Sequence, residues 1–246
     1  MIRFILCEGE TDATLLGLYL EKTTLWKFNK GRKPKPELNI PNTVPFSNKK
    51  AFYYIQDNNP LIICSVGGKD NFGKFFQEFV YPIIYLAQYE ETAFRIVLMT
   101  DADDNPVDGI ETDILKQLSP NIENIKNNIW KQNIIKNSFS EIANVDFLLS
   151  VIPEEGSGAL ETVLLNALSE TDKGTYIVEK SKDFIDELKT VPYLPTDRLK
   201  LKAKLGVALS VFYPDKVFSQ FDEQLKIVDW SKSEQLAKCL REIIKI

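Results

Sequence analysis

The sequence predicts an α/β protein built on a mainly parallel sheet. Four short apolar runs have the length and continuity of strands that are buried on both faces. These runs occupy residues 2–6, 60–66, 94–100 and 146–152. Each is followed by apolar residues at helical spacing, in the segments 13–20, 75–88, 109–118 and 159–168. Strands that alternate with helices in this way are typical of parallel sheets.

The rest of the chain carries weaker patterns. Residues 121–144 predict one or two helices, and residues 227–230 predict an edge strand. Further helices are predicted at residues 182–189, 197–212 and 232–246. We therefore expect a single domain over residues 1–246, with a basic, proline-rich insertion at about 26–46 and a helical C-terminal part at about 182–246.

The composition is that of a globular protein without membrane segments. Of the 246 residues, 44% are hydrophobic and 26% charged, and no apolar run approaches the ~20 residues of a membrane span. The N-terminus lacks the apolar length and the cleavage site of a signal peptide, so we expect a cytoplasmic protein. The three cysteines, Cys7, Cys64 and Cys239, are too widely spaced for a metal motif or a disulfide framework.

The chain contains no histidine, which narrows the possible chemistry. Ser-His-Asp and Cys-His catalysis, histidine general bases and histidine-bound zinc are all excluded. Hydrolysis would have to rely on carboxylates, lysine, tyrosine, serine or a metal held by oxygen ligands. The net charge of −5 argues against a general nucleic-acid coat, but it allows an enzyme that meets phosphates through a metal and a local basic strip.

A dense group of carboxylates follows the apolar run at 94–100. In the stretch VLMTDADD, Asp101, Asp103 and Asp104 lie within four positions. In an extended chain Asp101 and Asp103 point the same way, and crowded carboxylates repel each other unless a cation lies between them. Mg²⁺ suits such oxygen ligands, and open α/β sheets bind ligands at this edge. The alternative is an acidic turn, because Asp-Asn-Pro is favourable turn chemistry.

Acids and a lysine also follow other predicted strands. Glu8 ends the first run beside Gly9, where its side chain would enter a site at the sheet edge. Asp12 and Glu161 lie near helix starts, so each is either a site residue or an acid that complements the helix dipole. Lys69 follows two glycines after the second run and would stand at the same edge, although the spacing of a Walker phosphate loop is absent.

The basic loop at 26–46 is the first of two segments that could contact phosphate. Its candidate nucleic-acid-binding residues are Lys30, Arg32, Lys33 and Lys35. The aromatic residues Trp26, Phe28 and Phe46 at its edges could stack a base while the cations hold the phosphate backbone. The alternative is a solvated insertion without a ligand.

The predicted helix at 197–212 is the second basic segment. Arg198, Lys200, Lys202 and Lys204 alternate with apolar residues along it. Because residues two apart diverge around a helix, at most one or two of these cations can face any one site.

The order of these motifs resembles the TOPRIM domain, the metal-binding unit shared by topoisomerases, bacterial primases, recombination mediators and small nucleases. Its pattern is an E-G-x-x-D-like turn after the first strand and a D-x-D after a later strand. Here these are CEGETD, with Glu8 and Asp12, and TDADD, with Asp101 and Asp103. The GGKD turn and the GALE helix start are similar to those of a poorly characterised family of compact, stand-alone TOPRIM-like proteins.

The resemblance implies a TOPRIM-like Rossmannoid three-layer sandwich, with helices on both faces of the sheet, and metal-dependent phosphodiester or phosphoryl-transfer chemistry on nucleic acid. Three carboxylates, Glu8, Asp101 and Asp103, would hold Mg²⁺ or Mn²⁺. The nucleases of the lysogeny-defect type look similar too, and they add a helical acid and a late lysine. Glu161 would match that acid, and Lys204, or less closely Lys202, would match that lysine.

Several roles follow from the same resemblance. Asp12 and Glu161 would hold a second ion, and Lys204 or Lys69 would offset charge on the phosphate. Alternatively, Glu8 would act as a general acid or base. The sequence shows no breakage-reunion domain, no zinc module and no ATPase motif, which argues against a topoisomerase or a complete primase. Any ATPase partner would be a separate chain.

Other functions remain open at this level. A non-catalytic TOPRIM-like scaffold that binds nucleic acid or a protein partner is the main alternative, and the basic loop would then carry the binding. A response-regulator-like switch also places acids at strand ends, but a much shorter chain suffices for a receiver. A phosphatase of the haloacid-dehalogenase type places D-x-D after its first strand, whereas here it follows the third predicted strand.

Overall fold

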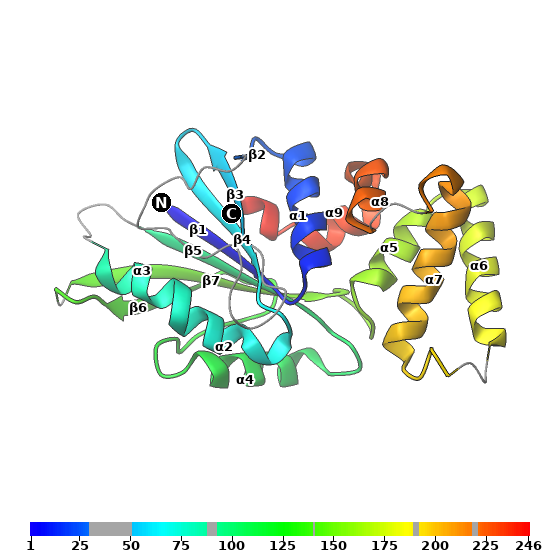
Figure 1. Ribbon diagram of the computed structural model, residues 1–246. Helices are drawn as coiled ribbons and strands as arrows, with labels where there is room; N and C mark the ends of the chain where they lie inside the picture. Colours follow the sequence, from blue (N-terminus) through cyan, green and yellow to red (C-terminus); the bar gives the residue numbers. More distant parts are fainter. Residues whose placement is uncertain (30–50, 88–92, 140, 189–191, 218–220) are drawn as a thin grey trace.

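The protein folds around a seven-stranded sheet (Figure 1). The computed structural model describes residues 1–29, 51–87, 93–139, 141–188, 192–217 and 221–246. Its strands are β1 (Ile2–Cys7), β2 (Lys27–Phe28), β3 (Ala51–Gln56), β4 (Asn59–Ser65), β5 (Phe94–Asp101), β6 (Lys131–Lys136) and β7 (Ile142–Ile152). They lie in the order β2-β3-β4-β1-β5-β7-β6. The α/β class predicted from the sequence is confirmed.

The sheet is mixed rather than mainly parallel. β1 pairs in parallel with β4 on one side and with β5 on the other, and β5 pairs in parallel with β7. At the two edges, β3 runs antiparallel to β4, β2 to β3, and β6 to β7. The parallel strands are the four that the apolar runs predict, and the antiparallel strands are the ones that the sequence patterns do not predict.

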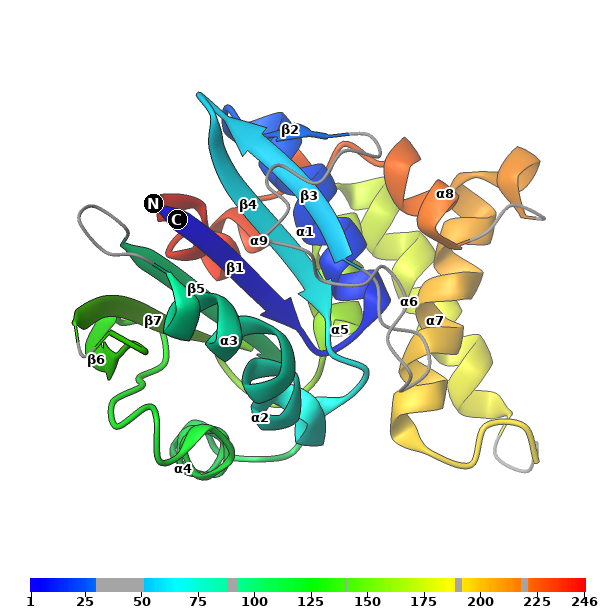
Figure 2. The same ribbon diagram turned by 60° about the vertical axis from the view of Figure 1, so that its left-hand side comes forward.

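Helices pack on both faces of the sheet, which is why the inner strands are continuously apolar (Figures 1 and 2). α1 (Glu10–Thr23) and α5 (Leu160–Leu168) contribute to the core on one face. α2 (Phe72–Phe75), α3 (Tyr81–Leu86) and α4 (Val107–Leu118) contribute to the core on the other. Successive residues of β1 divide between the two cores, since Ile5 joins the first and Leu6 the second.

The remaining helices follow α5. They are α6 (Asp172–Glu187), α7 (Asp197–Phe212), α8 (Phe221–Ile227) and α9 (Glu234–Leu240). α6 and α7 pack against each other, and α7 also packs on α5, so that this pair stands beyond the end of the sheet (Figures 1 and 2). None of the described helices is both long and apolar enough to cross a membrane.

The hairpin β3–β4 shows why β3 gives a weak sequence signal. Its turn is made by Asp57 (φ 47°) and Asn58 (φ 64°), which have the positive φ values of a two-residue hairpin turn without using glycine. Tyr53 and Tyr54 are both buried, one in the core on each face of the sheet. Adjacent buried residues of this kind do not produce the alternation that identifies a strand with one wet face.

Residues 121–144, predicted as helix, instead contain β6 and the start of β7. β6 turns Asn133 and Ile135 inward. The Asn133 side chain is buried because its Oδ1 accepts hydrogen bonds from the backbone N–H groups of Glu123 and Asn124, and its Nδ2 donates to the Asn124 carbonyl. An inward asparagine interrupts the apolar alternation, so the strand is hidden in the sequence.

The C-terminal helices also differ from expectation, except for α7, which spans the predicted residues. Residues 182–187 of the helix predicted at 182–189 are the end of α6, which begins at Asp172 because the side chain of Thr171 caps it, and residue 189 lies outside the described residues. The edge strand predicted at 227–230 is wrong, because these residues lead from the end of α8 into a 3₁₀ turn at Trp230–Lys232.

Gly73 sets the distance between α2 and α4. A Cβ atom on Gly73 would lie 2.3 Å from the backbone oxygen of Gln117, near the end of α4. We expect Gly73→Ala to lower the free energy of unfolding by about 1–3 kcal/mol, the usual cost of overpacking. Gly206→Ala is the matched control, because nothing lies within 4 Å of its added Cβ and alanine favours a helix by up to about 1 kcal/mol. Urea unfolding measures both, and an unchanged stability of Gly73→Ala would contradict this packing.

Candidate functional site

Two buried carboxylates meet where adjacent parallel strands end. Glu8 directly follows β1, and Asp101 is the last residue of β5. The chain leaves β1 toward β4 on one side, and it leaves β5 toward β7 on the other. This is the switch point at which open α/β sheets bind ligands. Glu8 is only 6% exposed and Asp101 only 4%, so both need partners within the protein.

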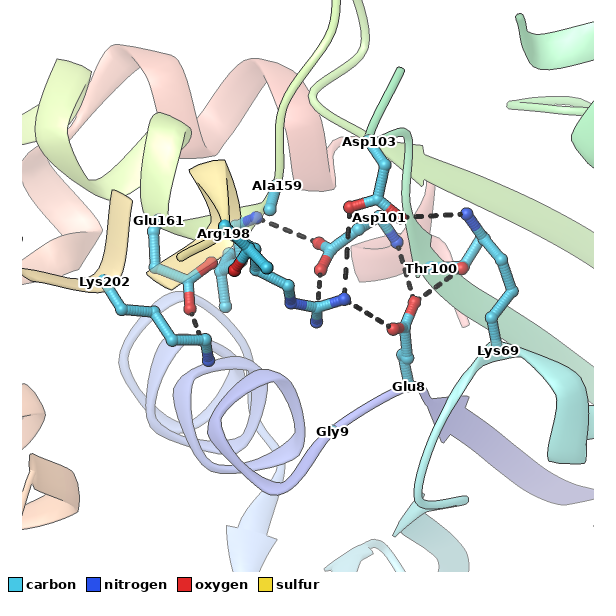
Figure 3. A network of polar contacts seen from close by, with 12 residues as sticks. Glu8, Gly9, Lys69, Thr100, Asp101, Asp103, Ala159, Glu161, Arg198 and Lys202 are labelled. Atoms are coloured by element: carbon cyan, nitrogen blue, oxygen red, sulfur yellow. Dashed lines mark hydrogen bonds and ion pairs between the residues drawn. The ribbon is translucent and has the colours of Figure 1, made fainter. Parts of the chain in front are cut away.

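Glu8 is held by the end of β5 and by the turn after β4 (Figure 3). Its Oε2 accepts hydrogen bonds from Thr100 Oγ1 at 3.0 Å and from the backbone N–H of Asp101 at 3.4 Å. Its carbonyl oxygen accepts from the backbone N–H groups of Gly67 and Gly68, at 3.0 and 2.9 Å. Both glycines have positive φ, which allows the turn to lie directly against the end of β1. Glu8 is therefore fixed at the sheet edge.

Asp101 connects β5 to α5. Its Oδ1 accepts a hydrogen bond of 2.9 Å from the backbone N–H of Leu160, the first residue of that helix. Burial is the main cause that raises the pKa of Asp101 to about 8, and the nearby charges of Asp12 and Glu8 add to it. The Asp101 side chain thus belongs to a crowded set of acids rather than to a solvated turn.

Asp103 lies beyond the strand, so the D-x-D segment is not extended as expected. Its φ is 50°, and it exchanges two backbone hydrogen bonds with Gly158, of 2.6 and 2.8 Å. These bonds join the turn after β5 to the loop after β7. The side chains of Asp101 and Asp103 nonetheless reach one common partner, Arg198 of α7.

The guanidinium of Arg198 lies among the three predicted metal ligands (Figure 3). Its Nη1 is 3.2 Å from Glu8 Oε1, and its Nη2 is 3.2 Å from Asp101 Oδ2. Nη1 also lies 4.0 Å from Asp103 Oδ1. The sequence does not identify Arg198 as a site residue. The alternation of basic residues along 197–212 is the one pattern that points to this helix, and it does not show which cation faces the sheet.

Lys202 repeats this arrangement one helical turn later. Its Nζ lies 2.9 Å from Oε1 of Glu161, which is 6% exposed. Two of the alternating cations of α7, Arg198 and Lys202, therefore face buried carboxylates of the acid cluster, because residues four apart share one side of a helix.

Asp12 lies close to this second ion pair and also caps a helix. Its Oδ2 accepts a 2.6 Å hydrogen bond from the backbone N–H of Gly9 at the start of α1. Burial raises the pKa of Asp12 to about 6 against the opposing effect of that hydrogen bond, and the charges of Glu8 and Glu161 contribute to the rise. The two readings of Asp12, cap and member of the acid cluster, are thus compatible.

The two predicted phosphate-facing lysines lie in different surroundings. Lys69 stands at the sheet edge, where its Nζ is 3.4 Å from Asp103 Oδ2. Lys204 lies farther along α7, and its Nζ is 2.7 Å from Asp186 of α6. Lys204 therefore forms its ion pair with α6, whereas Lys69 joins the acid cluster directly.

A cavity of about 400 Å³ adjoins the acid cluster. Its walls are the turn after β5, the loop between β7 and α5, and α7. The lining includes Asp103, Thr162, Arg198, Lys200 and Lys204. A volume of this size accepts a small-molecule-sized group, and its lining combines cations of α7 with the acids Asp103, Asp104, Asp186 and Asp197.

The donor atoms of the cluster fit a hard divalent cation. Glu8, Asp101 and Asp103 offer carboxylate oxygens, which Mg²⁺ and Mn²⁺ prefer. Within the part of the chain that the structure describes, however, no three acidic, cysteine or histidine side chains are gathered closely enough to hold a metal ion. The positive charge among the predicted ligands is instead supplied by Arg198.

The predicted nucleic-acid loop is largely outside the described residues. This applies to Lys30, Arg32, Lys33, Lys35 and Phe46. Trp26 cannot stack a base, because it is 2% exposed and packs in the core with Arg3 Cζ 5.4 Å from its ring centre. Phe28 is 41% exposed, and its ring lies 5.5 Å from that of Tyr54.

Fold and site together define an α/β protein with a mixed sheet and a carboxylate–arginine cluster at the ends of its parallel strands. The family model "Protein of unknown function (DUF3226)" matches residues 2–245, and the chain belongs to this family. Among solved structures, the chain is similar to the crystal structure of hypothetical protein PH0156 from Pyrococcus horikoshii OT3. The identity is 16% and the TM-score 0.48, over 99% of this chain and 100% of the other. No curated protein matches the chain.

The pKa of Asp101 predicts a specific dependence of stability on pH. Folding raises the pKa of Asp101 from its ordinary value of 3.8 to about 8, so the folded protein binds this proton more tightly than the unfolded chain does. The contribution of this group to stability is therefore full at low pH and is lost as the pH rises through this window, by at most ~1.4 kcal/mol per pH unit.

Two variants separate this effect from that of the neighbouring acid. Asp101→Asn should flatten the fall in the free energy of unfolding between about pH 4 and 8, whereas Asp12→Asn should flatten it only up to about pH 6. Urea unfolding across this range measures both slopes. Equal effects of the two substitutions above pH 6 would contradict the assignment.

Proposed function

We propose that this protein is a metal-dependent enzyme of TOPRIM type that cleaves or transfers phosphodiester groups of nucleic acid. The observation that carries the proposal is the convergence of Glu8 and Asp101, from adjacent strands, on a single cation. Carboxylates, which repel one another when ionised, are brought together in this way at sites that hold a positively charged ligand. The finer fold description, a TOPRIM-like Rossmannoid three-layer sandwich, belongs to the same proposal and is supported by the helices on both faces.

The carboxylates of the cluster would be the metal ligands. Glu8, Asp101 and Asp103 would hold Mg²⁺ or Mn²⁺, and Asp12 and Glu161 would hold a second ion. Bound there, such an ion supplies an activated water and charge stabilisation for displacement at phosphorus. Alternatively, Glu8 moves the proton itself as a general acid or base, for which its fixed position at the sheet edge is suited.

Basic side chains would receive the phosphate groups. Lys69 is close enough to Asp103 to offset charge that develops on a phosphate at the acid cluster. Lys204 lines the adjoining cavity, where it can contact the next phosphate along the strand. The cations Lys30 to Lys35 of the basic loop would extend this contact to the nucleic-acid backbone, and an ATPase, if one cooperates, would be a separate chain.

One observation favours a second candidate, a non-catalytic scaffold of the same fold that binds nucleic acid or a protein partner. Arg198 and Lys202 already neutralise part of the acid cluster without a metal ion. In such a scaffold the ion pairs would be purely structural. The two candidates differ in one property, because only the enzyme needs a divalent ion to change its substrate.

Cleavage of single- and double-stranded DNA and RNA, each with Mg²⁺ or Mn²⁺, distinguishes the two candidates. We expect Asp101→Asn to lose more activity than the ~10–100-fold typical of a residue that only orients a metal ligand, because it removes a charged ligand. Asp113→Asn is the matched control, since Asp113 is an exposed acid on α4 that pairs with Lys116. The control should cut like the wild type. Binding without cleavage by all three proteins would favour the scaffold.

A further inference from the structure

The cations of α7 occupy the positions in which divalent ions are expected. Arg198 lies on Glu8 and Asp101, which are the proposed ligands of the first ion. Lys202 lies on Glu161, a proposed ligand of the second. Both side chains come from one face of a single helix (Figure 3). This correspondence concerns the same site as the proposed function and rests on it.

Arg198 bridges the acids in the manner of a shared metal ion. Each of its two terminal nitrogens contacts a carboxylate from a different strand, at 3.2 Å in both cases. The planar fork of arginine can satisfy two acceptors at once, which a lysine ammonium at the same position would do less well. A metal ion and the guanidinium cannot both lie between Glu8 and Asp101.

The acids are fixed, whereas the cation is accessible. The side chains of Glu8 and Asp101 are 8% and 5% exposed, but that of Arg198 is 45% exposed. Arg198 also lines the adjoining cavity of about 400 Å³, which gives its side chain room to turn away from the acids. Displacement therefore requires movement of one long, half-exposed side chain and no rearrangement of the sheet.

We propose that Arg198 is the resident counterion of the acid cluster and that a divalent cation binds by displacing it. In the absence of metal, Arg198 holds Glu8 and Asp101 together and limits their mutual repulsion. Its ion pairs compete with metal binding, so that removal of Arg198 increases the affinity for Mn²⁺ or Mg²⁺. An ordinary positioning residue would have the opposite effect, since its removal weakens metal binding.

The test is calorimetric titration of the full chain with MnCl₂ alone, on wild type, Arg198→Ala and Arg198→Lys. We expect Arg198→Ala to bind Mn²⁺ on the order of tenfold more tightly than wild type, because two charge-assisted hydrogen bonds no longer compete. Arg198→Lys, which keeps the charge and guards against a folding defect, should fall between them. Lys180→Ala is the matched control: it removes one charge from the neighbouring helix α6, from an exposed lysine that pairs with Asp183, and should bind like wild type.

Thermal unfolding with and without MnCl₂ provides a second readout. Without metal, Arg198→Ala should have a lower melting temperature than wild type. Saturating Mn²⁺ should raise the melting temperature of Arg198→Ala by more than it raises that of wild type. Equal or weaker Mn²⁺ binding by Arg198→Ala overturns the displacement, while the proposed metal chemistry survives. Absence of Mn²⁺ binding in wild type and in both Arg198 variants instead overturns the metal-dependent function and this inference with it.

Discussion

The burial of two carboxylates at the ends of adjacent strands is the constraint that the rest of this site satisfies. Glu8 and Asp101 are almost withdrawn from water, and buried charges of one sign require donors or a cation. Thr100, the N–H of Leu160 and the guanidinium of Arg198 meet this requirement. Electrostatic attraction therefore helps to hold α7 against the sheet edge, because removal of this helix would leave the buried acids without their counterion.

The site has a rigid half and an adaptable half. Glu8, Asp101 and Asp103 stand on the sheet or on turns fixed by backbone hydrogen bonds, as the pairs Glu8–Gly68 and Asp103–Gly158 show. The cations stand on long side chains of α7 that are about half exposed. A site of this construction keeps its carboxylates in place while its positive charge is exchanged, which is what a change of counterion requires.

Sequence patterns identified the inner sheet and part of the site for local reasons. Strands buried on both faces are continuous apolar runs, so β1, β4, β5 and β7 were recognisable, and acids directly after them point to the sheet edge. β6 was not recognisable, because Asn133 faces inward and finds its partners in a preceding loop. The sequence places Trp26 at the edge of a basic loop, whereas the tertiary fold buries it, since the identity of a single aromatic residue does not show whether it is buried or exposed.

The sequence by itself determined which chemistry is available and that this chemistry lies at the carboxyl ends of the strands. The lack of histidine and the acids after two apolar runs are local facts, readable without knowledge of contacts. Only the tertiary structure decided which cation meets those acids. Glu8 and Arg198 are 190 positions apart, and four basic residues alternate along α7. The rotation and placement of that helix, set by its packing on α5 and α6, bring Arg198 to the acids and pair Lys204 with Asp186.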